Sequence, residues 1–146
     1  MKEACVDASV AVKWVLKNET LRSEAFTLLR KAQADSVRFI APPLFASEVD
    51  SVVRKRVFAG IMGAGEAKKA YICLDAAPVQ IIDMPGVRRK AREIAEQFRQ
   101  PYVYDATYAA LAQLRNCEFW TADRKFYDAV KSALPYVKFL GEITPD

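Results

Sequence analysis

Histidine is absent from this chain of 146 residues, and its absence excludes more chemistry than any other feature of the composition. Without imidazole there is no Ser-His-Asp or Cys-His nucleophile, no histidine general base and no histidine-bound metal. An enzymatic site must therefore use carboxylates, Lys, Tyr, Ser or Thr, with or without a metal ion held by oxygen.

Cysteine is scarce. Cys5, Cys73 and Cys117 stand far apart, are odd in number and form no CxxC pair. This pattern argues against a disulfide framework and against a zinc site. It favours three buried apolar thiols in a reducing compartment.

Long apolar runs are missing as well. No stretch approaches the roughly 20 apolar residues that a membrane span needs. Asp7 interrupts the short apolar run near the N-terminus, which speaks against a secretory signal. We therefore expect a cytoplasmic protein that makes no membrane contact.

What is present fits one domain over residues 1–146. Hydrophobic residues make up 52% of the chain and charged residues 27%, the balance of a globular protein with an apolar core. The net charge of +4 mildly favours a polyanionic partner.

Strand-like and helix-like segments alternate along the chain. The expected strands are Glu3–Val6, Val37–Ala41, Val79–Ile82, Glu118–Thr121 and Tyr136–Leu140. The expected helices are Ala8–Leu16, Thr20–Ala34 with Thr20 as N-cap, Leu44–Phe58, Gly65–Ala76, Val87–Phe98, Val103–Leu114 and Arg124–Ser132. Such alternation predicts an α/β fold with a central parallel five-stranded sheet flanked by helices.

Two acidic residues follow expected strands. Asp7 comes at the end of the first strand, and Asp123 just after Thr121. Ligands of open parallel sheets bind beyond the carboxyl ends of the strands, so we expect both side chains at one rim. Asp123 has an alternative role as the N-cap of the helix that follows it.

Glu48 and Asp105 are the other acidic candidates. Glu48 lies on the apolar stripe of its helix, where a carboxylate is costly unless it is paired or binds a metal. A rim position or a pairing with Arg54 or Arg56 stays open. Asp105 lies in the first turn of an expected helix rich in small residues, so a capping role is its alternative.

Four carboxylates at one rim repel one another, and a divalent cation offsets that repulsion. Oxygen ligands without His or Cys select Mg²⁺ or Mn²⁺ over Zn²⁺. A common task of such a site is hydrolysis of a phosphodiester bond.

Four motifs together resemble the PIN domain, and most closely its VapC-like toxin branch. They are Val6-Asp7-Ala8-Ser9 with Lys13-Trp14; Pro43-Leu44 before Glu48-Val49; Tyr104-Asp105-Ala106 before Ala109-Ala110-Leu111-Ala112; and Trp120-Thr121-Ala122-Asp123-Arg124. The motifs occur in the family's order and cover nearly the whole chain.

The resemblance implies a PIN-like nuclease domain and an Mg²⁺- or Mn²⁺-dependent endoribonuclease that hydrolyses RNA phosphodiester bonds. It also implies a homodimer and the toxin of a type II toxin-antitoxin system, neutralised by a cognate antitoxin protein. By this resemblance the catalytic and metal positions are Asp7, Glu48, Asp105 and Asp123, and the supporting hydroxyls are Ser9 and Thr121. Asp50 departs from the family pattern, and its spacing from Glu48 predicts that it faces solvent.

Basic and aromatic residues are candidates for RNA contacts. Lys13, Arg124 and Lys125 lie nearest the expected rim in the sequence and are the predicted phosphate contacts, with solvated helix faces as the alternative. Trp14, Tyr102 and Tyr104 could stack on bases, but the sequence favours core packing for each.

Two other functions remain open. An RNA-binding or scaffold PIN module with weak or no catalysis would share the fold. A receiver-like phospho-acceptor domain also places acids and Mg²⁺ at strand ends, but it needs a Lys after a late strand. Here Gly141 and Glu142 follow the last expected strand, and Lys138 lies inside it.

Overall fold

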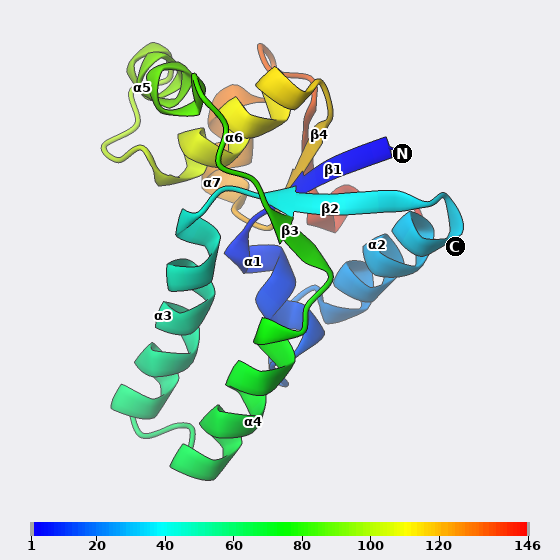
Figure 1. The fold of residues 1–146 in the computed structure, drawn as a ribbon, viewed down its shortest axis with the longest axis vertical. Coiled ribbons are helices and arrows are strands. Elements are labelled where there is room, and N and C mark those ends of the chain that lie inside the picture. The colour runs from blue at the N-terminus through cyan, green and yellow to red at the C-terminus, as the bar shows by residue number, and fades with distance from the viewer. Residues whose placement is uncertain (1, 146) are drawn as a thin grey trace.

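Strand β1 (Lys2–Val6) lies at the centre of a parallel sheet of five strands. The computed structural model describes residues 2–145, and its strand order is β3-β2-β1-β4-β5. The other strands are β2 (Val37–Ala41), β3 (Val79–Ile81), β4 (Glu118–Thr121) and β5 (Val137–Phe139). The predicted α/β fold and its five parallel strands are therefore confirmed, with ends shifted by at most a few residues (Figure 1).

The strand order reverses at β1, and this places the site. The chain moves from β1 outward through β2 and β3, then returns to the other side of β1 with β4 and β5. Val6 pairs with Trp120, so β1 and β4 end side by side. Asp7 and Asp123 follow these two ends, where parallel sheets open a crevice for ligands.

The helices connect the strands and lie on both faces of the sheet. They are α1 (Ala8–Ala11), α2 (Arg22–Ala34), α3 (Leu44–Phe58), α4 (Ala64–Asp75), α5 (Val87–Gln97), α6 (Tyr104–Arg115) and α7 (Arg124–Val130), with the 3-10 helices η1 (Val12–Trp14) and η2 (Leu140–Glu142). Figure 1 shows α3 and α4 as a helical pair that extends away from the sheet.

Two helices near the N-terminus differ from the prediction. Thr20 is not an N-cap: α2 begins at Arg22, and Leu21 occupies the cap position with a left-handed φ of 56°. The expected helix over Ala8–Leu16 divides into α1 and η1.

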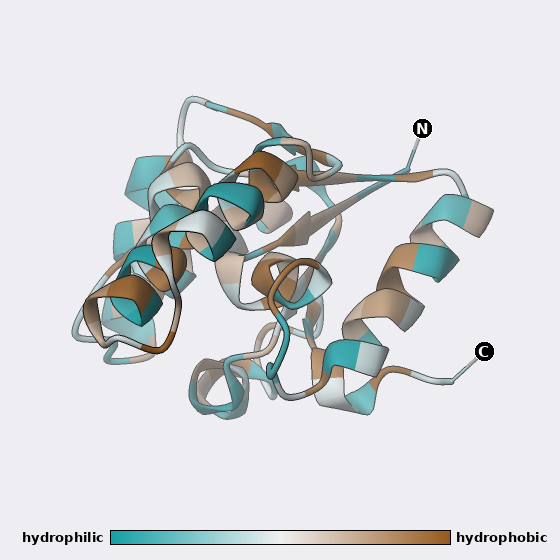
Figure 2. Cartoon of the chain, turned by 90° about the horizontal axis from the view of Figure 1, so that it is seen from below, coloured by the Kyte–Doolittle hydropathy of each residue, from teal (hydrophilic) through white to brown (hydrophobic). Residues whose placement is uncertain are grey.

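Apolar residues form one cluster on each face of the sheet. Alternate β1 side chains point to opposite faces, so Cys5 joins the larger cluster while Ala4 and Val6 join the smaller one beneath α2. Figure 2 shows largely apolar strands between helices that carry alternating hydrophilic and hydrophobic patches. Such amphipathic helices cover a sheet that is buried on both faces.

Helix α6 packs directly against β1, because its small side chains allow a close approach. Ala106, Ala109, Ala110 and Ala112 are all fully buried. Asn116 ends the helix in a left-handed conformation, with φ 56°, and β4 begins two residues later. This close packing sets the start of α6, and Asp105 with it, beside the end of β1.

The cysteine prediction is correct for Cys5 and wrong for Cys73. Cys5 is buried, Cys117 is partly buried, and Cys73 is exposed on α4; all three are free thiols. The spacing of Cys73 in the sequence left open which face of α4 would carry it. Within residues 2–145, no helix is both long enough and apolar enough to cross a membrane.

Candidate active site

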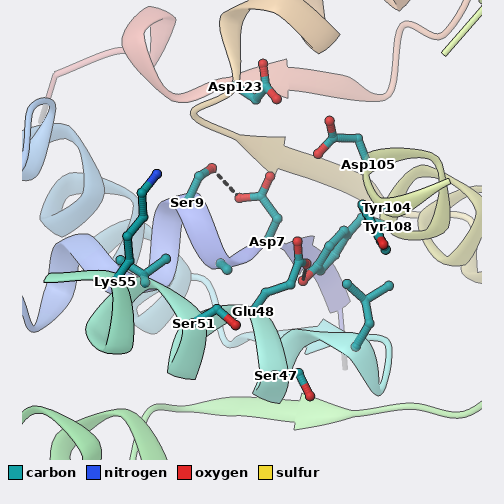
Figure 3. Close-up of a pocket in the computed structure, with 13 residues that line it drawn as sticks. Asp7, Ser9, Ser47, Glu48, Ser51, Lys55, Tyr104, Asp105, Tyr108 and Asp123 are labelled. Atoms are coloured by element: carbon teal, nitrogen blue, oxygen red, sulfur yellow. Dashed lines mark hydrogen bonds between the residues drawn. The ribbon is translucent and has the colours of Figure 1, made fainter. Parts of the chain in front are cut away.

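A pocket of about 640 Å³ opens at the carboxyl ends of β1 and β4, and all four predicted acids line it. Figure 3 shows Asp7, Glu48, Asp105 and Asp123 approaching one another from four different elements of the fold. The residues that line it are Asp7, Ala8, Ser9, Leu44, Ser47, Glu48, Ser51, Val52, Lys55, Tyr104, Asp105, Tyr108 and Asp123.

Asp7 forms the floor of the pocket, with an exposed fraction of 4%. Its carboxylate caps α1 by accepting from the Val10 amide at 3.2 Å, and it accepts from the Ser9 hydroxyl at 2.5 Å and the Thr121 hydroxyl at 2.6 Å. Burial raises the pKa of Asp7 from 3.8 to about 6, although these three hydrogen bonds favour the charged form and lower it. The two predicted supporting hydroxyls therefore hold one carboxylate in a fixed orientation.

Ser9 and Thr121 also join the ends of β1 and β4. Ser9 Oγ accepts from the Ala122 amide at 3.0 Å, and Thr121 Oγ1 accepts from the Asp123 amide at 3.0 Å. Because each hydroxyl binds Asp7 and the loop after β4 together, a change in either would displace Asp7 and Asp123 together.

Asp123 and Asp105 face one another across the top of the pocket (Figure 3). Asp123 caps α7 by accepting from the Phe126 amide at 3.1 Å. The capping role that the sequence suggested is therefore correct, and Asp123 lines the pocket as well. Burial, followed by the charges of Asp123 and Asp7, raises the pKa of Asp105 from 3.8 to about 8. Burial and the neighbouring negative charges therefore make ionisation of Asp105 less favourable than ionisation of an isolated carboxyl group in water.

Glu48 is half-buried on the opposite wall, where Tyr108 holds it. The Tyr108 hydroxyl donates to Glu48 Oε1 at 2.5 Å. Burial raises the pKa of Glu48, and this hydrogen bond lowers it. Neither suggested arginine partner is used: Arg56 binds Glu19 instead, and Arg54 is exposed.

Tyr108 is a site residue that the sequence interpretation missed. It is fully buried and stacks on Phe119, with ring centroids 5.6 Å apart and planes 10° apart. It lies three residues after Asp105, hence on the same side of α6. That spacing is a signal in the sequence, but only the tertiary structure brings Tyr108 of α6 to Glu48 of α3.

A polar strip along α3 completes the pocket. Ser47, Ser51 and Lys55 follow one another at helical spacing and line the wall beside Glu48. Lys55 is exposed and forms no ion pair within residues 2–145, so its ammonium remains available at the pocket edge. Asp50 is exposed and lies outside the pocket lining, which agrees with its predicted position.

The three predicted phosphate contacts lie in different surroundings. Lys13 is 5% exposed and binds Glu19 at 3.1 Å, so its expected contact with RNA finds no support in this placement. Arg124 is exposed but lies over the Phe139 ring at 5.2 Å and 3.7 Å from Asp128. Lys125 is exposed beside Asp123 and forms no ion pair within the described residues.

The donor set fits a hard divalent cation. Four carboxylates and two hydroxyls supply only oxygen, and no lysine or arginine in residues 2–145 forms an ion pair with any of the four acids. Within the same range, no three acidic or cysteine side chains stand in the arrangement of a preformed metal site. Mg²⁺ commonly binds through one or two carboxylates and keeps several waters, which such an open cluster permits.

The profile of the PIN domain family matches residues 4–131, most of the chain. This chain belongs to the PIN domain family. The resemblance found in its motifs is thereby confirmed. No curated protein sequence matches it.

Solved structures share this PIN fold at low sequence identity. A toxin-antitoxin complex from Klebsiella pneumoniae is 17% identical with a TM-score of 0.65, covering 96% of this chain and 99% of that one. The sarcin-ricin loop cleaving toxin VapC20 of Mycobacterium tuberculosis is 13% identical with a TM-score of 0.60, covering 90% and 95%. FitAB bound to an IR36 DNA fragment is 14% identical with a TM-score of 0.65, covering 97% of each chain.

Proposed function

We propose that this PIN domain is an Mg²⁺- or Mn²⁺-dependent endoribonuclease that hydrolyses RNA phosphodiester bonds. The observation that supports it best is the pocket of four converging carboxylates, none of which forms an ion pair with a lysine or arginine of residues 2–145. A charge cluster of this kind lowers the stability of the fold unless a cation binds it. A bound divalent metal would supply a water of lowered pKa and would stabilise charge on the phosphate oxygens.

The chain's own groups would have distinct roles. Asp7, held by Ser9 and Thr121, and Asp105 are the proposed principal metal ligands. Glu48, oriented by Tyr108, and Asp123 complete the acidic ring. Lys55 lines the pocket, and Arg124 and Lys125 begin α7 directly after Asp123. These three side chains would contact RNA phosphates and fix the position of the strand.

Cutting of RNA by the purified protein tests this proposal directly. We expect cleavage of single-stranded RNA in Mg²⁺ or Mn²⁺, and its loss in D7N and in D105N while the circular dichroism spectrum stays that of a folded protein. Asp50→Asn is the matched control, because it removes an exposed acid next to the site and should leave the rate unchanged. Equal cleavage by wild type, D7N and D105N would show that these acids are not the catalytic group.

The alternative is an RNA-binding or scaffold PIN module. Isothermal titration with Mn²⁺ separates the two, because the nuclease must bind metal and D105N must weaken that binding. RNA binding without any heat from Mn²⁺ at millimolar concentration would favour the scaffold.

We further propose that the protein is a homodimeric toxin with a cognate antitoxin. Support for the toxin role and the antitoxin comes from two similar folds, one from a toxin-antitoxin complex and one from FitAB bound to DNA, whereas the homodimer rests on the family resemblance alone. A small reading frame beside the gene that encodes a DNA-binding protein is the expected antitoxin. Its product should co-purify with this chain and inhibit RNA cleavage, and light scattering should give twice the mass of one chain. Cleavage that the neighbouring product does not inhibit would favour a housekeeping nuclease.

A further inference from the structure

Two exposed tyrosines lie around the start of α6, and one of them, Tyr104, lines the acidic pocket. Tyr102 is 68% exposed and Tyr104 is 55% exposed, so the core packing that the sequence favoured for them is wrong. Trp14, in contrast, packs against Phe39 and donates its indole N–H to the Ala25 carbonyl at 2.9 Å. The start of α6 therefore presents aromatic rings to solvent beside Asp105.

The two rings form an ordered pair. Their centroids are 5.7 Å apart and their planes differ by 20°, so each ring covers one face of the other. Val103 between them is 43% exposed, which extends the apolar patch. Exposed apolar patches of this kind mark sites where a soluble protein binds a partner.

Neither tyrosine has a role inside the fold that would explain its position. Tyr108, Tyr127 and Tyr136 each donate their hydroxyl to a protein oxygen. Within residues 2–145, the hydroxyls of Tyr102 and Tyr104 make no hydrogen bond. Neither ring is part of the core, where the alanines of α6 pack instead.

The position of Tyr104 beside the four acids indicates which kind of ligand its ring would bind. Tyr104 lines the same pocket as the four carboxylates and directly precedes Asp105 (Figure 3). A phosphodiester held at the acids through a divalent cation would therefore place its sugar and base next to this ring. An aromatic face beside a phosphate site is the arrangement that binds unpaired bases, because every base has a π face.

We infer that Tyr102 and Tyr104 form a stacking platform for one unpaired nucleobase next to the scissile phosphate. This inference rests on the proposed ribonuclease function and adds to it two residues that contact a base of the substrate. Paired bases in a duplex already stack on their neighbours and offer no free face. The platform therefore selects single-stranded RNA, such as loops and unpaired ends.

Binding of a fluorescent base analogue tests the platform without cleavage. The probe is a set of short, single-stranded oligoribonucleotides of mixed sequence in which 2-aminopurine replaces adenine, mixed with full-length D105N. We compare Tyr102→Leu and Tyr104→Leu, which lose the ring but keep apolar bulk, with Tyr104→Phe, which keeps the ring. Phe58→Leu is the matched control, because Phe58 is 75% exposed at the far end of α3 and does not line the pocket.

The expected result is a loss of affinity of about 5- to 150-fold in each Leu variant, the range for one stacked base. The change in 2-aminopurine fluorescence on binding should disappear with it. Tyr104→Phe and Phe58→Leu should bind within about twofold of the parent, because stacking needs the ring and not the hydroxyl. With the four acids intact, the Leu variants should raise KM and leave kcat unchanged, since the stack is present in ground state and transition state alike.

Two results would overturn the platform. One is equal affinity and equal fluorescence change in all variants. The other is a change in sedimentation of the Leu variants with no change in RNA binding, which would assign the rings to a protein contact. Failure of the proposed function looks different: wild type then cuts no RNA in Mg²⁺ or Mn²⁺, whatever the tyrosine variants bind.

Discussion

The Tyr108 hydroxyl donates to Glu48 Oε1 over 2.5 Å, and this bond joins α6 to α3 across the pocket. Tyr108 is fully buried against Phe119, so it cannot follow Glu48 if that side chain moves. The bond therefore sets where the Glu48 carboxylate stands relative to Asp7 and Asp105.

Replacing Tyr108 by Phe keeps the Glu48 carboxylate but removes the hydrogen bond that orients it, so this variant tests the effect of orientation alone. We expect RNA cleavage to fall by about 10- to 100-fold, the usual effect of losing a group that orients a metal ligand. The pKa of Glu48 should rise further, because a bond that favours its charged form is gone. A pH–rate profile measures both, with its acidic limb moving to higher pH.

Tyr136→Phe is the control for that variant. Its hydroxyl donates to the Ala109 carbonyl on the same helix and lies outside the pocket. It should cost stability of about 1 kcal/mol, as loss of a hydrogen bond does, and leave the rate unchanged. An equal loss of activity in both variants would show that disturbed packing of α6, and not the orientation of Glu48, causes the loss.

Replacing Asp105 by Asn should stabilise the protein in metal-free buffer. The folded-state pKa of Asp105 is about 8, above its ordinary 3.8, so ionisation opposes folding. The unfolded chain binds fewer protons than the folded one between these values, and stability must fall as pH rises from about 4 to about 8. Asn removes that charge and its cost to the folded state.

Thermal unfolding of wild type and D105N in EDTA measures this effect. The variant should melt at a higher temperature at pH 8, and the difference should shrink toward pH 4. A variant that melts below wild type at pH 8 would contradict the proposed cost of the acid cluster. Added Mg²⁺ or Mn²⁺ should raise the melting temperature of wild type more than that of D105N, since binding to the folded state adds about 2.7 kcal/mol at a hundredfold excess over Kd.

Lys55 and Lys125 should contribute affinity for RNA without sequence preference. Each phosphate contact with a single strand contributes about 0.7 to the slope of log K against log salt. We expect Lys55→Ala and Lys125→Ala each to lower that slope by about this amount. Lys69→Ala, which removes an exposed lysine of α4 outside the pocket, should leave the slope unchanged.

Lys13 distinguishes a phosphate contact from a structural cation. It is buried and bound to Glu19. Lys13→Met should therefore change stability and leave the salt slope as it is. If Lys13→Met lowers the slope of log K against log salt as much as Lys125→Ala does, Lys13 contacts an RNA phosphate.

Glu3 should stabilise the end of the sheet opposite the site. It accepts from Arg115 at 2.9 Å and also binds Arg38, its register partner on β2. The Arg115 bond, with help from Arg38, lowers the pKa of Glu3 from 4.5 to about 2 despite burial. This stability is present above pH 4.5 and is lost as pH falls toward 2.

Glu3→Gln should therefore lower the free energy of unfolding at pH 7 by about 1–3 kcal/mol, the range for hydrogen bonds to a charged group. Urea unfolding at pH 7 and at pH 3 tests it, because the difference from wild type must narrow at pH 3. RNA cleavage should not change, since Glu3 is outside the acidic pocket. If the difference in free energy of unfolding between Glu3→Gln and wild type is as large at pH 3 as at pH 7, the variant loses packing and not the charge of Glu3.

Much of this protein follows from its sequence. The alternation of strands and helices determined the parallel sheet, since parallel neighbours need crossovers and these need helices. The positions of Asp7 and Asp123 after two strands determined that both would reach one rim. The absence of histidine limited the ligands to oxygen. These features are local or topological, and local pattern suffices for them.

Other features were decided only by the tertiary structure. Tyr108 binds Glu48 across 60 positions of chain, and no spacing along either helix reveals which helices meet. Lys13 is buried with Glu19, and Tyr102 and Tyr104 are exposed, because burial depends on what packs against a residue and not on its type. The four acids were visible in the sequence, but the raised pKa values of Asp7, Glu48 and Asp105 come first from burial, which only folding sets.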